Sequence, residues 1–377
     1  MTTKDKVLID AISLLSPLTG IGRYTYEISK RLQSDSLFDI NYFYGYYSKN
    51  RVEPSSKSQI KNITSIIKKI PLLKKIIRKL IVLKTKMYHP SYDLYWQPNA
   101  MPTENIKTNK VVTTVHDFSF IMYAEFHPKE RIEYLEKNFM NNIHKSDMII
   151  TGSNFSKNEI LERLDFEDDQ VEVIYHGIDH DLFKVYNIKD LVLDFELPEK
   201  FILTVGSIEP RKNLRGLLEA YSQLSAQIKK EYKLVLAGFK GWENKEIMKL
   251  IDNNKENIHY LGFVSDRELS TIYNLASLFV FPSHYEGFGL PVLEAMACGT
   301  PVVCSDSSSL PEVGGDCVVY CDAKSVDDIS KKIEYVLLDK VLQKTMSLSG
   351  LQRAQCFTWE KSTQEHIKVF KKVLSEK

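Results

Sequence analysis

Several features that would fix a compartment or a class of partner are scarce or missing in this chain of 377 residues. Cysteine occurs five times, and an odd number of thiols does not make a framework of paired bridges. Lysine and arginine number 50 against 49 aspartates and glutamates, so the formal charge of +1 gives no overall attraction to nucleic acid. No apolar run reaches the roughly 18 residues of a membrane-spanning helix. The opening segment MTTKDKVLIDAISLL has too short an apolar run for a secretory signal, so we expect a reduced protein in the cytoplasm.

What the sequence does contain is a repeated alternation of short apolar runs and helical patterns. Continuous Val/Ile/Leu runs, rather than strict alternation with polar residues, are typical of strands covered on both faces. The expected strands are Val7-Leu8-Ile9, 111–115, Met148-Ile149-Ile150, 171–174, 201–205, Leu234-Leu236, 278–281 and Val302-Val303. Helical stripes lie between them, for example Ile21, Tyr24, Ile28 and Leu32. The alternation predicts an α/β fold with parallel sheets.

The alternation is interrupted once, between residues 183 and 200, where the sequence is charged and has no clear period. A second series of strand and helix patterns starts at Phe201. We therefore predict two Rossmann-like domains that face each other across a cleft, residues 1–185 and 186–357. In open parallel sheets the ligand site lies beyond the carboxyl ends of the strands, so the loops there are the places to look for chemistry.

Residues 54–92 differ from the rest of the chain because they contain ten lysines or arginines and no acidic residue. After Pro71 the apolar residues follow helical spacing, which makes the basic segment 57–86 amphipathic. Such a segment suits an anionic membrane surface, where each basic residue contributes on the order of 1 kcal/mol. The alternative is a helix packed on its own sheet with lysines in solvent.

The most informative stretch is PSHYEGFGLPVLEAMACGTP, residues 282–301. Gly287 and Gly289 allow a ligand to approach the backbone, and the predicted helix that follows offers free N–H groups to phosphate oxygens. Glu286 lies in the loop and Glu294 lies in the helix, eight positions further on. Two carboxylates beside an anion-binding helix start can accept hydrogen bonds from sugar hydroxyls.

This stretch resembles the two-glutamate signature of the retaining glycosyltransferases of family 4, which have the two-domain GT-B fold. Further motifs occur in the order of the family: Gly20 to Thr25 (GIGRYT), His116-Asp117, Gly206 to Asn213 (GSIEPRKN), Gly262-Phe263-Val264 and Leu310-Pro311-Glu312. Within the family the sequence is most similar to the bacterial O-antigen mannosyltransferase B group, which uses GDP-mannose. The resemblance implies transfer of a sugar, most simply mannose, to a lipid-linked glycan in polysaccharide biosynthesis. It also implies that the carboxyl-terminal helix, 358–377, packs back on the first domain.

The GSIEPRKN motif follows an expected strand, which puts Arg211 and Lys212 at its carboxyl end. Two cations there can neutralise a diphosphate, whose charge makes the sugar–phosphate bond costly to break without fixed positive charge. The family uses the matching basic pair in this way. We therefore assign the diphosphate to Arg211 and Lys212, with Ser207 beside them.

The resemblance supplies roles for the other candidate residues. Glu286 would hold the sugar hydroxyls and Glu294 the ribose, while His116, at the end of a strand, would contact the sugar near the reacting carbon. The remaining donor-binding candidates are Gly22, Phe263, Val264, Gly287, Phe288, Gly289 and Leu290. Gly22 belongs to a glycine loop that is expected before a helix starting near Arg23.

No cofactor or metal is expected, because the GT-B resemblance implies none. Asp179-His180-Asp181 has the spacing of a metal-binding Asp-X-Asp motif of another glycosyltransferase class, but that triplet is short enough to arise by chance. The expected partners are a nucleotide-sugar donor, a lipid-linked glycan acceptor and the inner face of the cytoplasmic membrane, without nucleic acid.

Several alternatives remain open from the sequence. The donor sugar could be rhamnose, glucose or galactose. A sugar-nucleotide epimerase would share the GT-B architecture. An oxidoreductase on a dinucleotide-binding fold is disfavoured by the missing third glycine after Gly22, and a non-catalytic binder is disfavoured by the complete set of phosphate and sugar residues.

Overall fold

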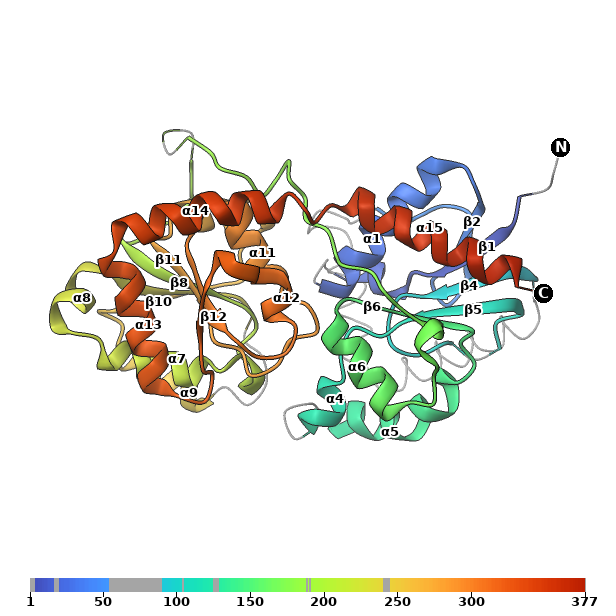
Figure 1. The fold of residues 1–377 in the computed structure, drawn as a ribbon, viewed down its shortest axis with the longest axis horizontal. Coiled ribbons are helices and arrows are strands. Elements are labelled where there is room, and N and C mark those ends of the chain that lie inside the picture. The colour runs from blue at the N-terminus through green and yellow to red at the C-terminus, as the bar shows by residue number, and fades with distance from the viewer. Residues whose placement is uncertain are drawn as a thin grey trace.

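The computed structural model describes residues 4–16, 20–53, 90–103, 105–124, 129–187, 189, 191–239 and 245–376. These residues form two lobes, each an α/β unit built on its own sheet (Figure 1). The predicted fold class is confirmed. The basic segment 57–86 lies outside the described residues, so its interpretation stays a prediction.

The amino-terminal lobe has a sheet of order β3-β2-β1-β4-β5-β6-β7, parallel except for the pairing of β3 with β2. Its strands are β1 Lys6–Asp10, β2 Asp39–Phe43, β3 Tyr47–Ser48, β4 Tyr92–Gln97, β5 Thr108–Thr114, β6 Met148–Thr151 and β7 Val171–Val173. Its helices are α1 Gly20–Asp35, α4 Ser119–Met122, α5 Lys129–Ile143 and α6 Asn154–Arg163.

The carboxyl-terminal lobe has an all-parallel sheet of order β10-β9-β8-β11-β12-β13. Its strands are β8 Phe201–Val205, β9 Lys233–Ala237, β10 Ile258–Gly262, β11 Leu278–Phe281, β12 Val302–Ser305 and β13 Val319–Cys321. Its helices are α7 Leu214–Gln223, α8 Ala226–Glu231, α9 Lys245–Asp252, α10 Asp266–Leu275, α11 Leu290–Ala297, α12 Leu310–Gly314, α13 Val326–Leu338 and α14 Lys340–Ala354.

Burial on both faces explains why the strands of this second sheet are continuously apolar. Ile202 and Leu278 pack into one hydrophobic cluster, whereas their chain neighbours Leu203 and Phe279 pack into another on the opposite face. Successive strand residues point to opposite faces, so a sheet that helices cover on both sides needs apolar residues at every position.

The last helix, α15 Trp359–Ser375, leaves the second lobe and lies against the first (Figure 1). Trp359 and Phe370 are buried in the same cluster as Trp96 of β4. The phenol of Tyr24 on α1 is hydrogen bonded to His366 Nε2 at 2.5 Å. The chain passes between the lobes twice, and at these two crossings Ile178 and Thr358 form an isolated parallel bridge. The two crossing segments therefore run side by side.

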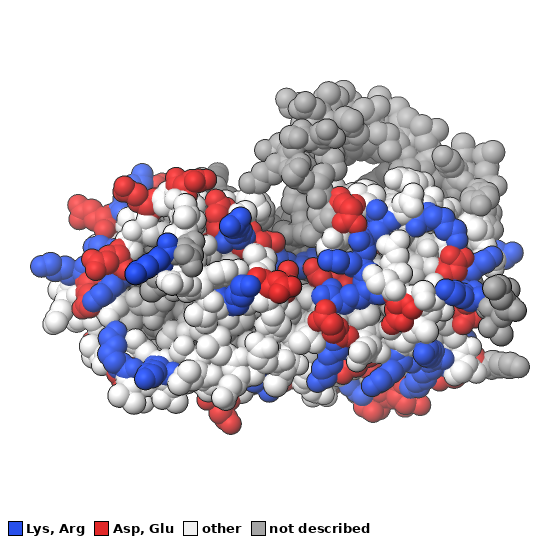
Figure 2. All heavy atoms as spheres, turned by 90° about the horizontal axis from the view of Figure 1, so that it is seen from above, with Lys and Arg blue, Asp and Glu red and all other residues white. Residues whose placement is uncertain are grey.

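Two features of the surface bear on partners. On the face drawn in Figure 2, acidic and basic side chains are interspersed over both lobes, as the near-zero net charge implies. Among the residues that the structure describes, no helix has the length and apolar character needed to cross a bilayer.

Candidate active site

The candidate site lies where loops from the carboxyl ends of β8 and β11 meet. Arg211 and Lys212 belong to a short 3-10 turn, Pro210–Lys212, after β8, and Glu286 lies in the loop between β11 and α11. The N–H of His284 donates to the carbonyl of Arg211 at 2.8 Å, and Arg211 Nη1 donates to the carbonyl of Tyr285 at 3.2 Å. The two loops are therefore joined by one backbone hydrogen bond and by one from the Arg211 side chain.

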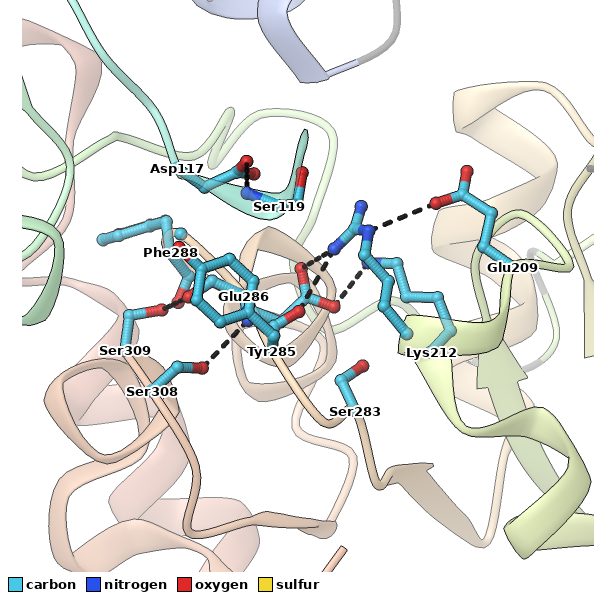
Figure 3. A network of polar contacts seen from close by, with 12 residues as sticks. Asp117, Ser119, Glu209, Lys212, Ser283, Tyr285, Glu286, Phe288, Ser308 and Ser309 are labelled. Atoms are coloured by element: carbon cyan, nitrogen blue, oxygen red, sulfur yellow. Dashed lines mark hydrogen bonds and ion pairs between the residues drawn. The ribbon is translucent and has the colours of Figure 1, made fainter. Parts of the chain in front are cut away.

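Both cations contact the same carboxylate. Arg211 Nη1 lies 3.1 Å from Glu286 Oε2, and Lys212 Nζ lies 2.5 Å from Glu286 Oε1. Figure 3 shows Lys212 directed toward the Glu286 carboxylate. Arg211 also pairs with Glu209 at 3.2 Å, and the hydroxyl of Ser207 donates to the same Glu209 carboxylate. The three charged side chains of Arg211, Lys212 and Glu286 are largely buried.

Burial and the neighbouring charges act on these groups in opposite directions. Burial opposes ionisation of Glu286, but the charges of Lys212 and Arg211 outweigh it, and the pKa of Glu286 lies below its ordinary value. Burial and the charge of Arg211 lower the pKa of Lys212. Two closely spaced cations, Arg211 and Lys212, therefore share one carboxylate. A second anion can bind favourably to these two cations.

The backbone around Glu286 is fixed by two serines. Ser308 Oγ accepts from the N–H of Glu286 at 2.9 Å, and Ser309 Oγ donates to the carbonyls of Glu286 and Phe288 at 2.8 Å each (Figure 3). The loop thus presents the carboxylate from a rigid support, which is what precise positioning of a substrate requires.

The first lobe meets this loop at Gly287. A Cβ atom on Gly287 would lie 2.1 Å from the carbonyl oxygen of His116 and 2.9 Å from Asp117 Cβ, so the two lobes touch here through a glycine. Asp117 Oδ1 accepts from the N–H of Ser119 at 2.9 Å, which fixes the turn after β5.

His116 is half-buried at this junction and its Nε2 lies 2.9 Å from the carbonyl oxygen of Pro98. Because a carbonyl only accepts, the hydrogen-bond network assigns the proton to Nε2 and leaves Nδ1 as an acceptor. Burial lowers the pKa of His116 and so favours the neutral ring.

Glu294 lies on α11 and is buried, unlike an ordinary exposed helical glutamate. Tyr273 donates its hydroxyl to Glu294 Oε2 at 3.1 Å, and Arg23 Nη1 of the other lobe lies 3.7 Å from Oε1. Arg23 is also paired with Asp266 at 2.5 Å. Burial raises the pKa of Glu294 to about 7, although the charge of Arg23 opposes that rise.

The remaining candidates lie around this centre. Gly289 has φ +115°, a left-handed conformation, and a Cβ there would meet the Leu310 side chain at 2.6 Å. Phe288 packs on the ring of His176, and Leu290 is the first residue of α11. Phe263 is half-exposed, stacks on Phe239 beyond β9 and β10, and is followed by Val264.

A small cavity opens beside the diphosphate candidates. It is lined by residues at the carboxyl ends of β8 and β9, among them Gly206, Ser207, Lys212 and Ala237. Its position agrees with the rule that ligands of parallel sheets bind beyond the carboxyl ends of the strands.

Two expectations need comment. The predicted glycine loop before Arg23 is wrong in its boundary, because α1 already begins at Gly20 and Gly22 is buried inside its first turns. Glycine lowers the stability of a helix, but it is tolerated in α1 because Gly22 is buried where this helix packs on its neighbours.

The Asp179-His180-Asp181 triplet forms a local turn. Asp179 Oδ1 accepts hydrogen bonds from the N–H groups of Asp181 and Leu182 and so closes that turn.

Known proteins that are similar to this chain show its family. Residues 18–182 match the family described as "Glycosyltransferase Family 4", and residues 192–353 match "Glycosyl transferases group 1". The chain is 34% identical over 380 residues to "O-antigen chain mannosyltransferase B" of Escherichia coli, covering 97% of this chain and 99% of the relative. The chain belongs to this glycosyltransferase family.

Solved structures of low sequence identity support the fold of this glycosyltransferase. Sucrose-phosphate synthase from Thermosynechococcus elongatus superposes with a TM-score of 0.75 at 18% identity, covering 99% of this chain and 100% of that one. WaaG, a glycosyltransferase involved in lipopolysaccharide biosynthesis, superposes with a TM-score of 0.71 at 14% identity, covering 97% and 99%. Both confirm the predicted two-lobed GT-B architecture.

Sequence reasoning missed the residues of this glycosyltransferase that join the lobes. Tyr285, next to Glu286, accepts the N–H of Phe118 at 2.9 Å and donates its hydroxyl to Glu159 of α6. Tyr273 of α10, which donates to Glu294 within the second lobe, was missed as well, whereas Arg23, which reaches Glu294 from the first lobe, belongs to the GIGRYT motif that the sequence had already singled out. The only sequence signal was the adjacency of Tyr285 to the motif, since the partners are distant in the chain.

Proposed function

We propose that this glycosyltransferase moves mannose from GDP-mannose to a lipid-linked glycan in O-antigen or related polysaccharide synthesis, with retention of the anomeric configuration. The observation that carries the proposal is the joint contact of Arg211 and Lys212 with Glu286. The name of the O-antigen chain mannosyltransferase B relative supports mannose as the sugar.

The ion-pair cluster suggests how the donor would bind. The diphosphate would take the two cations as its partners, and Glu286, thereby relieved of its ion pairs, would accept hydrogen bonds from the sugar hydroxyls. Glu294 would accept hydrogen bonds from the ribose. The cations would stabilise negative charge as it develops on the leaving diphosphate.

The reaction that follows from this arrangement is a front-face displacement. The bond between the sugar C1 and the diphosphate oxygen breaks, and the acceptor oxygen bonds to C1 from the same face. The acceptor hydroxyl passes its proton to the departing diphosphate. His116 would contact the sugar near C1, and the touching lobes would keep water from competing with the acceptor.

The basic segment 57–86 supports a further part of the proposal, contact with an anionic membrane surface, where a lipid-linked acceptor would be held. Ten basic residues without an acidic one between positions 54 and 92 suit such a surface. The enzyme would then act as a peripheral protein on the inner face of the cytoplasmic membrane, with no metal or cofactor required.

The proposal is tested with GDP-mannose and the UDP, dTDP and ADP sugars, using a synthetic mannose-terminated glycan on a hydrophobic aglycone as acceptor. We expect GDP to bind at least about tenfold more tightly than the other diphosphates, and NMR of the product to show the donor's anomeric configuration. Lys212→Ala should lower turnover by about 10²- to 10³-fold, whereas Lys200→Ala, an exposed surface substitution, should not.

Other outcomes would contradict particular parts of the proposal. Transfer from a rhamnose, glucose or galactose donor, but not from GDP-mannose, would overturn the donor. An altered nucleotide sugar formed without acceptor would identify an epimerase. Near-normal transfer by the Lys212→Ala variant would overturn the assigned diphosphate site.

A further inference from the structure

The amino-terminal end of α6 is closed by a carboxylate that comes from the other lobe. Glu312 on α12 accepts the backbone N–H of Phe155 at 2.7 Å through Oε1 and that of Asn154 at 2.8 Å through Oε2. The same Oε2 accepts the side-chain amide of Asn154 and the hydroxyl of Tyr175, each at 3.0 Å. The first N–H groups of a helix lack partners within the helix, and the helix dipole favours negative charge there.

Glu312 is itself held firmly on its own lobe. Arg353, near the end of α14, donates to the carbonyl of Glu312 at 2.6 Å and to that of Val313 at 3.2 Å. The guanidinium of Arg353 also lies 5.0 Å from the centre of the Phe357 ring. The backbone that carries the Glu312 carboxylate is therefore fixed to the carboxyl-terminal lobe.

The same helix also receives the loop that carries Glu286. Ser153, the N-cap residue of α6, donates its hydroxyl to the carbonyl of Gly287 at 2.9 Å. Glu159, further along α6, accepts the hydroxyl of Tyr285. The residues on both sides of Glu286 thus contact α6, and Glu312 fixes the position of that helix.

We propose that Glu312 is a positioning residue for glycosyl transfer. Its carboxylate binds the amino-terminal end of α6 across the interface, a contact that we call the Glu312 clasp. This contact holds the lobes in the arrangement in which the Glu286 loop meets His116. The inference rests on the glycosyltransferase activity of the family and not on the identity of the donor sugar.

The test compares Glu312→Gln and Glu312→Ala with the wild type. The diphosphate candidates Arg211 and Lys212 lie on one lobe, so GDP affinity should stay within about threefold, while kcat falls by about 10- to 100-fold because the reacting groups are displaced. Small-angle scattering without nucleotide should show a larger radius of gyration for both variants. Glu334→Gln, a half-buried glutamate on α13, is the matched control and should change none of these values.

A second variant removes hydrogen-bond donors of the Glu312 clasp on the α6 side. Asn154→Pro removes both donors of residue 154, and proline is well tolerated at the first position of a helix. The preceding Ser153 is already extended, with φ −155° and ψ 157°, as a residue before proline must be. If the contact acts as described, the Asn154→Pro/Glu312→Gln double variant should lose little more activity than Glu312→Gln alone.

Each result decides the matter. A kcat within twofold of the wild type in folded Glu312→Gln, or additive losses in the double variant, would overturn the proposal, as would GDP affinity that falls in parallel with kcat. Thermal unfolding of each variant shows whether it is folded at the assay temperature. If the wild type transfers no mannose, the proposed donor is wrong. The radius of gyration of the nucleotide-free proteins still tests whether the Glu312 clasp holds the lobes together.

Discussion

At the scale of single residues, the two motif glutamates differ in their surroundings more than in their burial. Glu286 has two cations within 3.1 Å, whereas Glu294 has Arg23 at 3.7 Å. The pKa of Glu286 is accordingly lowered, while burial raises that of Glu294 to about 7. The two carboxylates therefore have different charge states near neutral pH.

This difference leads to a prediction about pH. Ionised Glu294 is the better acceptor for ribose hydroxyls, so the affinity for GDP-mannose should increase between pH 6 and pH 8, and Glu294→Gln should abolish most of that increase. Isothermal titration with GDP-mannose measures this, because its phosphate diester groups do not titrate in the range. An increase of the same size in Glu294→Gln would contradict the role given to Glu294.

The same group has an effect of opposite sign on folding. Its pKa in the folded protein lies above the ordinary value of 4.5, so its contribution to stability is complete below about 4.5 and is lost as the pH rises through about 7. Glu294 thus favours nucleotide binding at the pH where it no longer favours folding, a tension common at functional sites.

At the scale of elements, the loop from β11 to α11 is shaped by how closely the first lobe approaches it. Gly287→Ala would place a methyl group 2.1 Å from the backbone of His116, which cannot move aside as a flexible side chain can. We expect kcat to fall at least about tenfold, because the loop that carries Glu286 is displaced from His116. Gly350→Ala on α14 is the control, because the nearest atoms to its methyl group would belong to Met296, at 3.3 to 3.6 Å. Normal turnover in Gly287→Ala would show that the lobes need not touch there.

The elements also show how far the sequence could be interpreted. The apolar runs at 201–205 and 278–281 coincide with β8 and β11, because strands buried on both faces leave a continuous signal. β2 and β4 were missed, since Asp39–Phe43 and Tyr92–Gln97 mix aromatic and polar residues. In β4 the polar Gln97 is satisfied by Asp10, a partner that no local pattern reveals.

Part of the candidate site could likewise be predicted from the sequence, and part could not. Arg211, Lys212 and Glu286 could be predicted to lie together, because each follows a strand of the same parallel sheet. The partners from the first lobe could not, because the contacts of Arg23 and Glu159 depend on how the two lobes dock. Such docking is set by the whole fold and leaves no periodic trace in the chain.

At the scale of the whole molecule, α15 ties the end of the chain into the first lobe through a buried polar contact. His366 Nε2 faces the phenol of Tyr24, and its Nδ1 lies 2.7 Å from the carbonyl of Ser362. Burial lowers the pKa of His366 to about 4. The neighbouring His176 is buried as well and His116 is half-buried, and removal from water lowers the pKa values of both.

Acidification should therefore loosen the first lobe. A depressed pKa means that stability is complete above the ordinary value of about 6.5 and is lost as the pH falls through about 4, a loss of about 3 kcal/mol for His366 alone. Urea unfolding at pH 7.5 and pH 5 should show a smaller decrease for His366→Gln than for the wild type. His144→Gln, an exposed control, should match the wild type. Equal decreases in all three proteins would refute the role of His366.

The paired crossings at Ile178 and Thr358 have a mechanical consequence. Two adjacent chain segments connect the lobes along one line, so we expect the lobes to swing about that line more easily than they slide past each other. Both ends of the described chain lie on the amino-terminal lobe, as Figure 1 shows. A tag or fluorophore attached at either end would therefore report on that lobe alone, and a distance probe of the swing needs its second label on the carboxyl-terminal lobe.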